Sequence, residues 1–133
     1  MTALHLIPTD KVRDAWKYGE KFVQRLCERT KLYEPQHIRE ICASDGMQLW
    51  FVVDGEEVLA TAITWLVQFP LAKVCYCVVA GEHMDRWLHL LSEIEDWARS
   101  AGCRELVLDR ARKGWARKIP DYDLTGIVLE KSL

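Results

Sequence analysis

The chain has 133 residues, of which 50% are hydrophobic and 29% are charged, and this composition fits one globular domain, residues 1–133, built around one core. Its 18 Lys and Arg and 20 Asp and Glu leave a formal net charge of -2, which excludes binding to nucleic acid or anionic membranes through total charge alone. Six Trp, four Tyr and three Phe exclude a disordered chain.

The N-terminal third predicts a strand followed by two helices. Ala3–Ile7 alternates weakly, as a short strand does. Apolar residues then recur with the 3.6-residue period of a helix, which we place at Lys11–Arg29. A second helix is predicted to start at Pro35 and to stop at Ser44–Gly46.

The middle of the chain predicts three consecutive strands. Leu49–Val53 and Glu57–Leu66 are rich in β-forming residues, and Asp54–Gly55 between them is a hairpin signal. Lys73–Ala80 is apolar enough to be a central strand that is covered on both faces. The short links between the three strands predict an antiparallel meander.

The C-terminal part returns to helical periodicity. Met84–Ala101 predicts a long helix, with Gly102 as its C-terminal cap and Arg104–Leu108 as the next strand. A strand, a helix and a strand form a βαβ unit, so the strands at Lys73 and Arg104 should be parallel. A short helix at Ala111–Ile119 and a final strand at Leu124–Lys131 complete the prediction.

The five cysteines do not predict a metal site. Their number is odd and they include no C-x-x-C pair: Cys27, Cys42, Cys75, Cys77 and Cys103. Cys75 and Cys77 share one face of a predicted strand, but His83 is the only nearby extra ligand, and a zinc site needs four. We expect buried thiols in a reducing compartment and no metal.

Two further signals concern location. No apolar stretch approaches the roughly 20 residues of a membrane span. The first five residues have neither the basic start nor the apolar block of a signal peptide. We therefore expect a cytoplasmic protein that does not bind membranes.

The order of the predicted elements, β-α-α-β-β-β-α-β-α-β, resembles the GNAT superfamily of N-acetyltransferases over essentially the whole chain. The resemblance implies an α/β (α+β) fold in which a mixed, mostly antiparallel twisted sheet carries helices on both faces. The tail is also similar to small GNAT-like proteins encoded in bacteriophage and prophage genomes, through Gly114–Arg117, Tyr122 and Leu129–Lys131.

The same resemblance implies a cofactor site for acetyl-CoA. In the family, the strand equivalent to Lys73–Ala80 binds the pantetheine arm through its backbone, and the loop after it binds the pyrophosphate. The residues that this places at the cofactor are Val79, Gly81 and Arg86. A small amine would then be the acceptor.

The cofactor loop departs from the family pattern. Active members carry Arg/Gln-x-x-Gly-x-Gly/Ala, in which glycines let backbone N–H groups approach the phosphates. The corresponding stretch here, Ala80–Trp87, has one glycine, and it places Glu82 and Asp85 where phosphate charges would lie. Because these carboxylates complement the helix dipole and repel a pyrophosphate, we expect a loop that is filled by its own side chains.

The sequence does not identify the catalytic residues. Family members often use a Tyr on the last helix as the general acid, and this chain has Trp115 there, which cannot donate an acidic proton. Tyr122 lies beyond the motif position and is as consistent with packing as with catalysis. Cys75 and Tyr76 alternate on a strand, so one of them could line a cleft, although packing explains both more simply.

Charge is distributed unevenly along the C-terminal half. Residues 82–96 carry five carboxylates and one arginine, whereas residues 99–118 carry seven basic and two acidic side chains. The two segments could steer a charged protein partner or self-association as a homo-oligomer, or they could be solvated helix faces. Arg110, Lys113 and Arg117 could share one helix face and meet CoA phosphates or an acidic protein surface. Nucleic acid is the partner with the least support.

Three functions follow from these observations. The first is an N-acetyltransferase in which acetyl-CoA enters between the strands at Lys73–Ala80 and Arg104–Leu108. The second is a non-enzymatic GNAT-fold protein of phage origin that acts as a binding, inhibitory or virion component, and the third is an enzyme with another acyl carrier. An open cleft between the two strands favours the enzyme, and a gap filled by Trp87, Leu88 or Trp115 would count against it.

Overall fold

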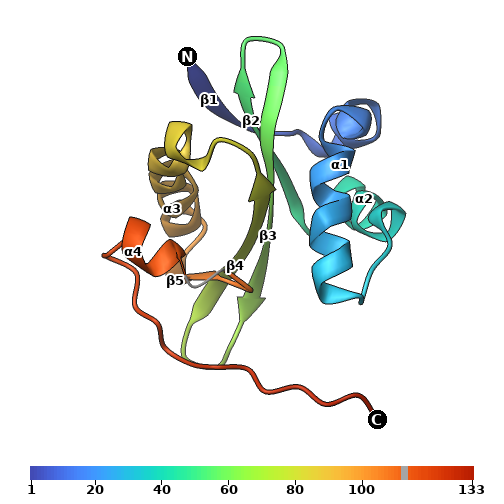
Figure 1. Ribbon diagram of the computed structural model, residues 1–133. Helices are drawn as coiled ribbons and strands as arrows, with labels where there is room; N and C mark the ends of the chain where they lie inside the picture. Colours follow the sequence, from blue (N-terminus) through green and yellow to red (C-terminus); the bar gives the residue numbers. More distant parts are fainter. Residues whose placement is uncertain (112–113) are drawn as a thin grey trace.

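A five-stranded sheet in the order β1-β2-β3-β4-β5 organises the chain (Figure 1). The computed structural model describes residues 1–111 and 114–133. Neighbouring strands are antiparallel from β1 to β4, and β4 and β5 are parallel. The strands are β1 (Thr2–Leu6), β2 (Gln48–Asp54), β3 (Glu57–Gln68), β4 (Lys73–Gly81) and β5 (Cys103–Leu108). This confirms the predicted meander and the parallel pair.

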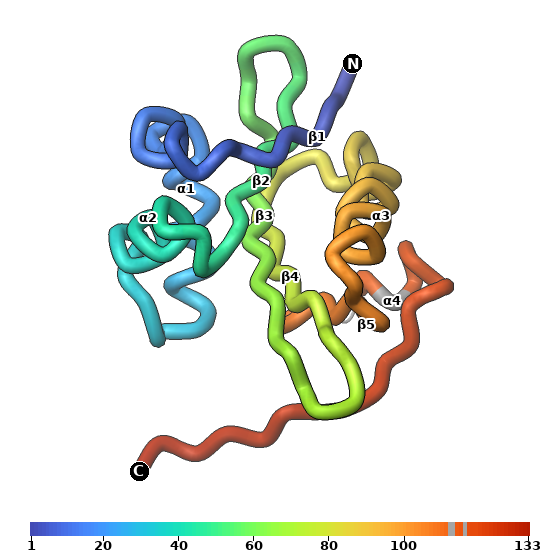
Figure 2. Tube along the Cα trace, turned by 180° about the vertical axis from the view of Figure 1, so that it is seen from behind, coloured from blue at the N-terminus to red at the C-terminus, as the bar shows by residue number. Residues whose placement is uncertain are grey.

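Helices cover both faces of the sheet. The helices α1 (Val12–Thr30) and α2 (Pro35–Ala43) lie on one face, and α3 (Leu91–Ser100) and α4 (Trp115–Lys118) lie on the other (Figures 1 and 2). The predicted architecture, a mixed and mostly antiparallel sheet between two helical layers in one domain, is therefore confirmed. No helix in the described part of the chain is long and apolar enough to cross a membrane.

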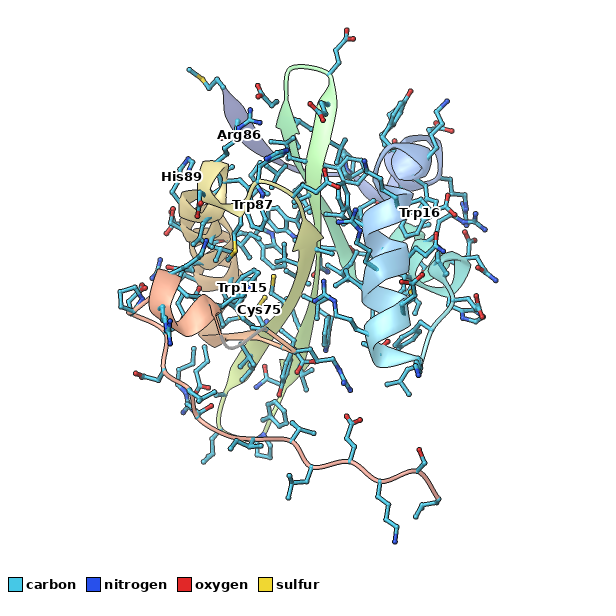
Figure 3. All side chains as sticks on the ribbon, viewed as in Figure 1. Trp16, Cys75, Arg86, Trp87, His89 and Trp115 are labelled. Carbon is cyan, nitrogen blue, oxygen red and sulfur yellow. The ribbon has the colours of Figure 1, made fainter. Side chains whose placement is uncertain are left out.

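The sheet is apolar on both faces, because each helical layer packs a separate core against it. Phe22 of α1 is fully buried with Leu49 and Ile63 on the first face. Trp50 and Ile94 are buried on the second face, where the ring of Trp50 meets that of Trp97 edge to face, with 5.3 Å between centroids. Adjacent strand residues point to opposite faces, so the continuous apolar runs in the sequence supply both cores (Figure 3).

The helix predicted at Met84–Ala101 starts later than expected. Two 3-10 turns, Met84–Arg86 and Leu88–Leu90, precede α3. Trp87 separates them with φ of -133° and ψ of -4°, which is not helical. Its indole Nε1 donates a hydrogen bond to the carbonyl oxygen of Glu82 at 2.7 Å. The segment therefore keeps its apolar side chains on the core, but as tight turns that follow the end of β4.

The end of the chain differs most from the prediction. The final strand predicted at Leu124–Lys131 is wrong, because residues 123–133 form no regular structure. Its apolar side chains are more than three-quarters exposed: Leu124, Ile127, Val128 and Leu129. An alternating pattern becomes a strand only when a neighbouring strand pairs with it. Of the helix predicted at Ala111–Ile119, Trp115–Lys118 forms α4, and residues 112 and 113 lie outside the described part.

Candidate functional site

The two parallel strands diverge halfway along β4. Pairing between β4 and β5 runs from Lys73 and Cys103 to Cys77 and Leu108. Beyond Cys77, the rest of β4 is paired with β3 alone in the described part of the chain. After β5 the N–H of Asp109 donates to the carbonyl oxygen of Cys77 at 2.9 Å, and the chain then turns away. The sheet is thus open at this end, between its last two strands.

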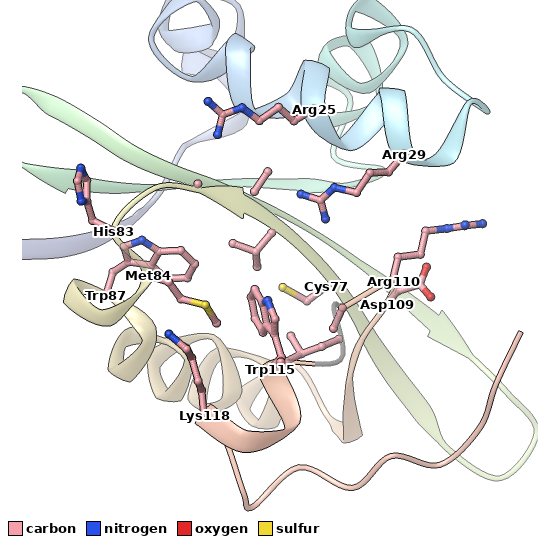
Figure 4. Close-up of a pocket in the computed structure, with 16 residues that line it drawn as sticks. Arg25, Arg29, Cys77, His83, Met84, Trp87, Asp109, Arg110, Trp115 and Lys118 are labelled. Atoms are coloured by element: carbon pink, nitrogen blue, oxygen red, sulfur yellow. The ribbon is translucent and has the colours of Figure 1, made fainter.

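A cavity of about 500 Å³ occupies the opening (Figure 4). Its walls are the end of β4, the loop that follows it, the residues after β5, and side chains of α1 and α4. Both helical layers therefore contribute to a single cavity. The volume lies within the range of small-molecule binding sites in proteins.

Two tryptophans form the apolar wall of this cavity. Trp87 is 3% exposed, and Trp115 of α4 lies beside it, with 6.4 Å between ring centroids and 61° between ring planes. Met84 completes the wall. Leu88 packs into the core of the α3 face and is not among the described lining residues. The tryptophans line the opening but leave its volume accessible, so the two strands are separated by an open cleft.

The acidic side chains of the loop are directed toward basic partners. Glu82 pairs with Arg25 of α1 at 2.9 Å, and the hydrogen bond from that guanidinium lowers the pKa of the Glu82 carboxyl. Asp85 pairs with Lys118 of α4 at 2.8 Å. Among the described residues, neither carboxylate lines the cavity. The N–H groups of Met84 and Asp85 have no acceptor in this part of the structure.

The structure places two of the three residues expected at the cofactor on the cavity wall. Val79 and Gly81 line the cavity. Arg86 is not among the described lining residues: its guanidinium pairs with Asp54 at the end of β2, and its carbonyl oxygen accepts a hydrogen bond from Thr2. Asp54 also binds the amino terminus, and both cations lower the pKa of its carboxyl.

Gly81 is required by the packing of β3 against β4. It pairs with Ala60 in the antiparallel ladder. A Cβ atom at position 81 would overlap the Cβ of Ala60 and lie 2.7 Å from the carbonyl oxygen of Leu59. This steric reason for glycine is independent of any phosphate, and it fixes the backbone where the loop leaves the sheet.

The substitution Gly81→Ala is expected to lower the free energy of unfolding by about 1–3 kcal/mol, because the added methyl group overpacks a tight contact between strands. Urea unfolding followed by tryptophan fluorescence measures this change. Gly126→Ala is the matched control, since a Cβ there meets nothing within 4 Å. Equal stability of the two variants would show that β3 and β4 are not in close contact at this point.

Charged side chains gather around the cavity. Arg25 and Arg29 of α1, Arg110 after β5 and Lys118 of α4 line it. Asp109 is the one carboxylate among the described lining residues. Arg110, which has a positive φ of 55°, is also 3.3 Å from Glu130 in the C-terminal segment. Of the basic cluster expected at Arg110, Lys113 and Arg117, position 113 lies outside the described residues.

Sequence reasoning did not find Arg25, Arg29 or Asp109. The two arginines lie on the polar edge of α1, far from the cofactor loop in sequence, and Asp109 lies just past a strand end. The signal that could have found the arginines is their spacing of four residues, which places them on one helix face. Nothing in the sequence alone brings that face to β4.

Tyr122 is bound to α3. Its hydroxyl donates a hydrogen bond to Oε2 of Glu95 at 2.6 Å. Burial and this bond raise the pKa of Tyr122 well above its usual range. It is not among the described residues that line the cavity. The arrangement gives Tyr122 a role in attaching the C-terminal segment to α3, in agreement with the packing alternative.

All five cysteines are free thiols, and four of them are buried. Cys77 lines the cavity, and burial raises the pKa of its thiol far above the ordinary value. Burial also raises the pKa values of Cys42 and Cys75 to about 12. These groups are therefore protonated and weakly reactive at neutral pH. Among the described residues, no three His, Cys, Asp or Glu side chains are grouped so as to hold a metal ion.

The diverging parallel strands and the cavity between them are the fold of the GNAT acetyltransferases. No protein-family model matches the sequence, and a comparison with curated proteins finds no significant match. The similarity is therefore structural.

Three solved structures illustrate the similarity. An aminoglycoside acetyltransferase from an uncultured soil metagenomic sample, in complex with sisomicin, has a TM-score of 0.72 at 9% identity, covering 99% of this chain and 96% of that one. A predicted acetyltransferase with acetyl-CoA from Clostridium acetobutylicum has a TM-score of 0.65 at 12% identity, covering 98% and 96%. Glucosamine-6-phosphate N-acetyltransferase from Arabidopsis thaliana has a TM-score of 0.64 at 15% identity, covering 99% and 98%.

Proposed function

We propose that this protein is an N-acetyltransferase that transfers the acetyl group of acetyl-CoA to an amine. The observation that carries the proposal is the open cavity of about 500 Å³ where β4 and β5 diverge. An α/β sheet without a ligand to admit has no need to part its central strands, because the exposed backbone loses hydrogen bonds. Similar solved structures include an acetyltransferase with acetyl-CoA, which supports the same function.

The residues present fit the chemistry of acetyl-CoA. On the side that faces β5, the backbone of β4 beyond Cys77 has no strand partner in the described chain, so Val79 can pair with the amides of the pantetheine arm. The free N–H groups of Met84 and Asp85, together with Lys118, are donors suited to phosphate oxygens. Met84, Trp87 and Trp115 supply an apolar surface for the remaining methylene groups.

Asp109 is the group in the described cavity wall that can accept a proton from the amine. Acetyl-CoA supplies an activated thioester, and the amine nitrogen attacks its carbonyl carbon. A C–N bond forms, the C–S bond breaks, and the thiol of CoA leaves. Asp109 lies at the point of divergence, where its own N–H is fixed to Cys77, so its carboxylate can take the amine proton as general base.

The loop after β4 is a reduced form of the family loop and lowers the affinity for the cofactor. It carries one glycine, at position 81, and it keeps Glu82 and Asp85 close to the expected phosphates. The ion pairs of these carboxylates with Arg25 and Lys118 offset part of the repulsion. Because both pairs are exposed, they are weak, and Lys118 can exchange its carboxylate for a phosphate.

Acetyl-CoA is expected to stabilise the folded protein. A ligand at 100 times its dissociation constant raises the free energy of unfolding by about 2.7 kcal/mol, which thermal unfolding over a titration measures. ATP at the same concentrations is the control, since it carries an adenine nucleotide and phosphates without a pantetheine arm. A melting temperature that does not move at millimolar acetyl-CoA would contradict the proposal.

One observation favours a second function, a non-enzymatic GNAT-fold protein that binds a partner through its surface. Arg86, the cation expected at the cofactor phosphates, is instead paired with Asp54. A loop that has lost its cation and its second glycine is what such a protein would keep. Its phage origin, its partner and its oligomeric state stay predictions. The acetyl-CoA titration separates the two functions, because the second requires no stabilisation.

A further inference from the structure

The cavity has a second side that belongs to α1. This helix lies on the opposite face of the sheet from α3 and α4 (Figure 1), yet Arg25 and Arg29 of α1 line the same cavity as Trp115 and Lys118 of α4. The cavity therefore reaches through the opening between β4 and β5 and borders both helical layers. A site that is lined from two faces has room for two substrates, one on each side.

The α1 side is a concentration of guanidinium groups. Arg25 and Arg29 are four residues apart and therefore share one face of the helix. Figure 4 shows Arg29 extending from α1 toward the opening. The guanidinium carbon of Arg25 lies 5.1 Å from the ring centroid of buried Phe22, which holds the side chain against the helix. Planar guanidinium groups bind carboxylate and phosphate oxygens with two parallel hydrogen bonds.

The pair between Arg25 and Glu82 does not block this role. Both side chains are nearly half exposed, at 44% and 45%, and an exposed pair of this kind contributes little to stability. An entering anion can therefore replace Glu82 on Arg25. A cationic acceptor would instead meet Arg25, Arg29 and Arg110 in a wall whose one described carboxylate is Asp109.

We propose that the acceptor is an amine that also carries an anionic group, a carboxylate or a phosphate, and that Arg25 and Arg29 bind that group on the α1 side of the cavity. The inference rests on the proposed acetyltransferase function. Acetyl-CoA takes the loop side, where Lys118 and the N–H groups of Met84 and Asp85 lie. The amine then points at the opening, and its anionic end points at α1.

The test uses the full chain, saturating acetyl-CoA and matched pairs of amines, with release of the CoA thiol as the readout. β-Alanine is compared with 3-amino-1-propanol, and O-phosphoethanolamine with ethanolamine, so that the two pairs distinguish carboxylate from phosphate. We expect kcat/KM to be about tenfold or more higher for the acidic member of at least one pair, because a site built for a charged group rejects the analogue that lacks it.

Two variants test the arginines directly. Arg25→Gln and Arg29→Gln should each lower kcat/KM for the preferred acidic amine by about tenfold and leave its neutral analogue and the affinity for acetyl-CoA unchanged. Calorimetric titration measures that affinity separately. Arg13→Gln is the matched control, since Arg13 lies on the same helix but pairs with Glu40 of α2 at 2.7 Å, and it should behave like the unaltered protein.

The outcomes separate this inference from the function on which it rests. If acetyl-CoA binds but neutral amines are acetylated as well as acidic ones, or no acidic amine is acetylated, the inference is wrong and the cofactor site stands. Weaker acetyl-CoA binding in the arginine variants would assign both side chains to the cofactor and would also overturn it. If acetyl-CoA does not bind at all, the inference and the proposed function fail together.

Discussion

Replacing Asp109 with asparagine is expected to lower kcat by about 10²- to 10⁴-fold, the usual contribution of a positioned general base. The reason is that other carboxylates near the cavity are engaged: Glu82 with Arg25, Asp85 with Lys118 and Glu130 with Arg110. Asparagine keeps the size of the side chain but cannot accept the proton. The affinity for acetyl-CoA should be unchanged, because Asp109 meets the amine and not the cofactor.

Steady-state kinetics with acetyl-CoA and the best acidic amine, together with calorimetry of cofactor binding, measure the two quantities. Asp96→Asn is the control, since Asp96 is an exposed carboxylate of α3 that pairs with Arg99, and it should leave kcat unaltered. If Asp109→Asn retains full kcat, the amine proton goes to solvent or to another group. A joint loss of kcat and of acetyl-CoA affinity would instead place Asp109 at the cofactor.

The substitution Trp87→Ala is expected to lower the free energy of unfolding by about 3–5 kcal/mol, as large aromatic-to-alanine changes in a core do. Trp87 is 3% exposed, its ring contacts that of Trp115, and its indole N–H satisfies the carbonyl oxygen of Glu82. Truncation therefore opens a void, removes one wall of the cavity and leaves a carbonyl group of the loop without its donor.

Urea unfolding measures the loss, and Trp87→Phe separates its two parts. Phenylalanine keeps most of the ring contact but lacks the N–H, so that this variant should lose about 1–3 kcal/mol, the cost of an unsatisfied buried acceptor. Acetyl-CoA affinity should fall in Trp87→Ala more than in Trp87→Phe. Alanine and phenylalanine variants of equal stability would mean that the ring does not pack in the wall.

The strands and the first two helices were predictable because their periodicity is strong and their links are short. Leu49–Val53 and Glu57–Leu66 became β2 and β3 around the turn at Gly55, which has the positive φ that glycine tolerates. Gly102, after α3, has a positive φ for the same reason. The parallel pairing of β4 and β5 followed from the connection between them, a rule of chain handedness that holds regardless of particular side chains.

The errors occurred where tertiary contacts decide the local structure. Trp87 leaves helical geometry because its indole reaches the carbonyl oxygen of Glu82, and periodicity carries no sign of that bond. Leu124–Lys131 has a strand pattern, but in the structure no strand pairs with it, and a pattern alone cannot supply a neighbour.

The site divides in the same way. Val79 and Gly81 were found because topology places the end of the central strand at the opening. Arg86 was expected there too, but the hairpin end at Asp54 and the amino terminus lie closer to it. Arg25 and Arg29 come to the cavity only through the packing of α1 on the sheet, which a single sequence does not reveal.

The buried thiol of Cys77 has a consequence for the course of the transfer. It is the sulfur atom in the described cavity wall nearest to being a nucleophile, yet burial keeps it protonated. An acyl-enzyme formed on cysteine is therefore not open to this protein. The acetyl group has no resting place between donor and acceptor, so both substrates must occupy the cavity together and the reaction must pass through a ternary complex.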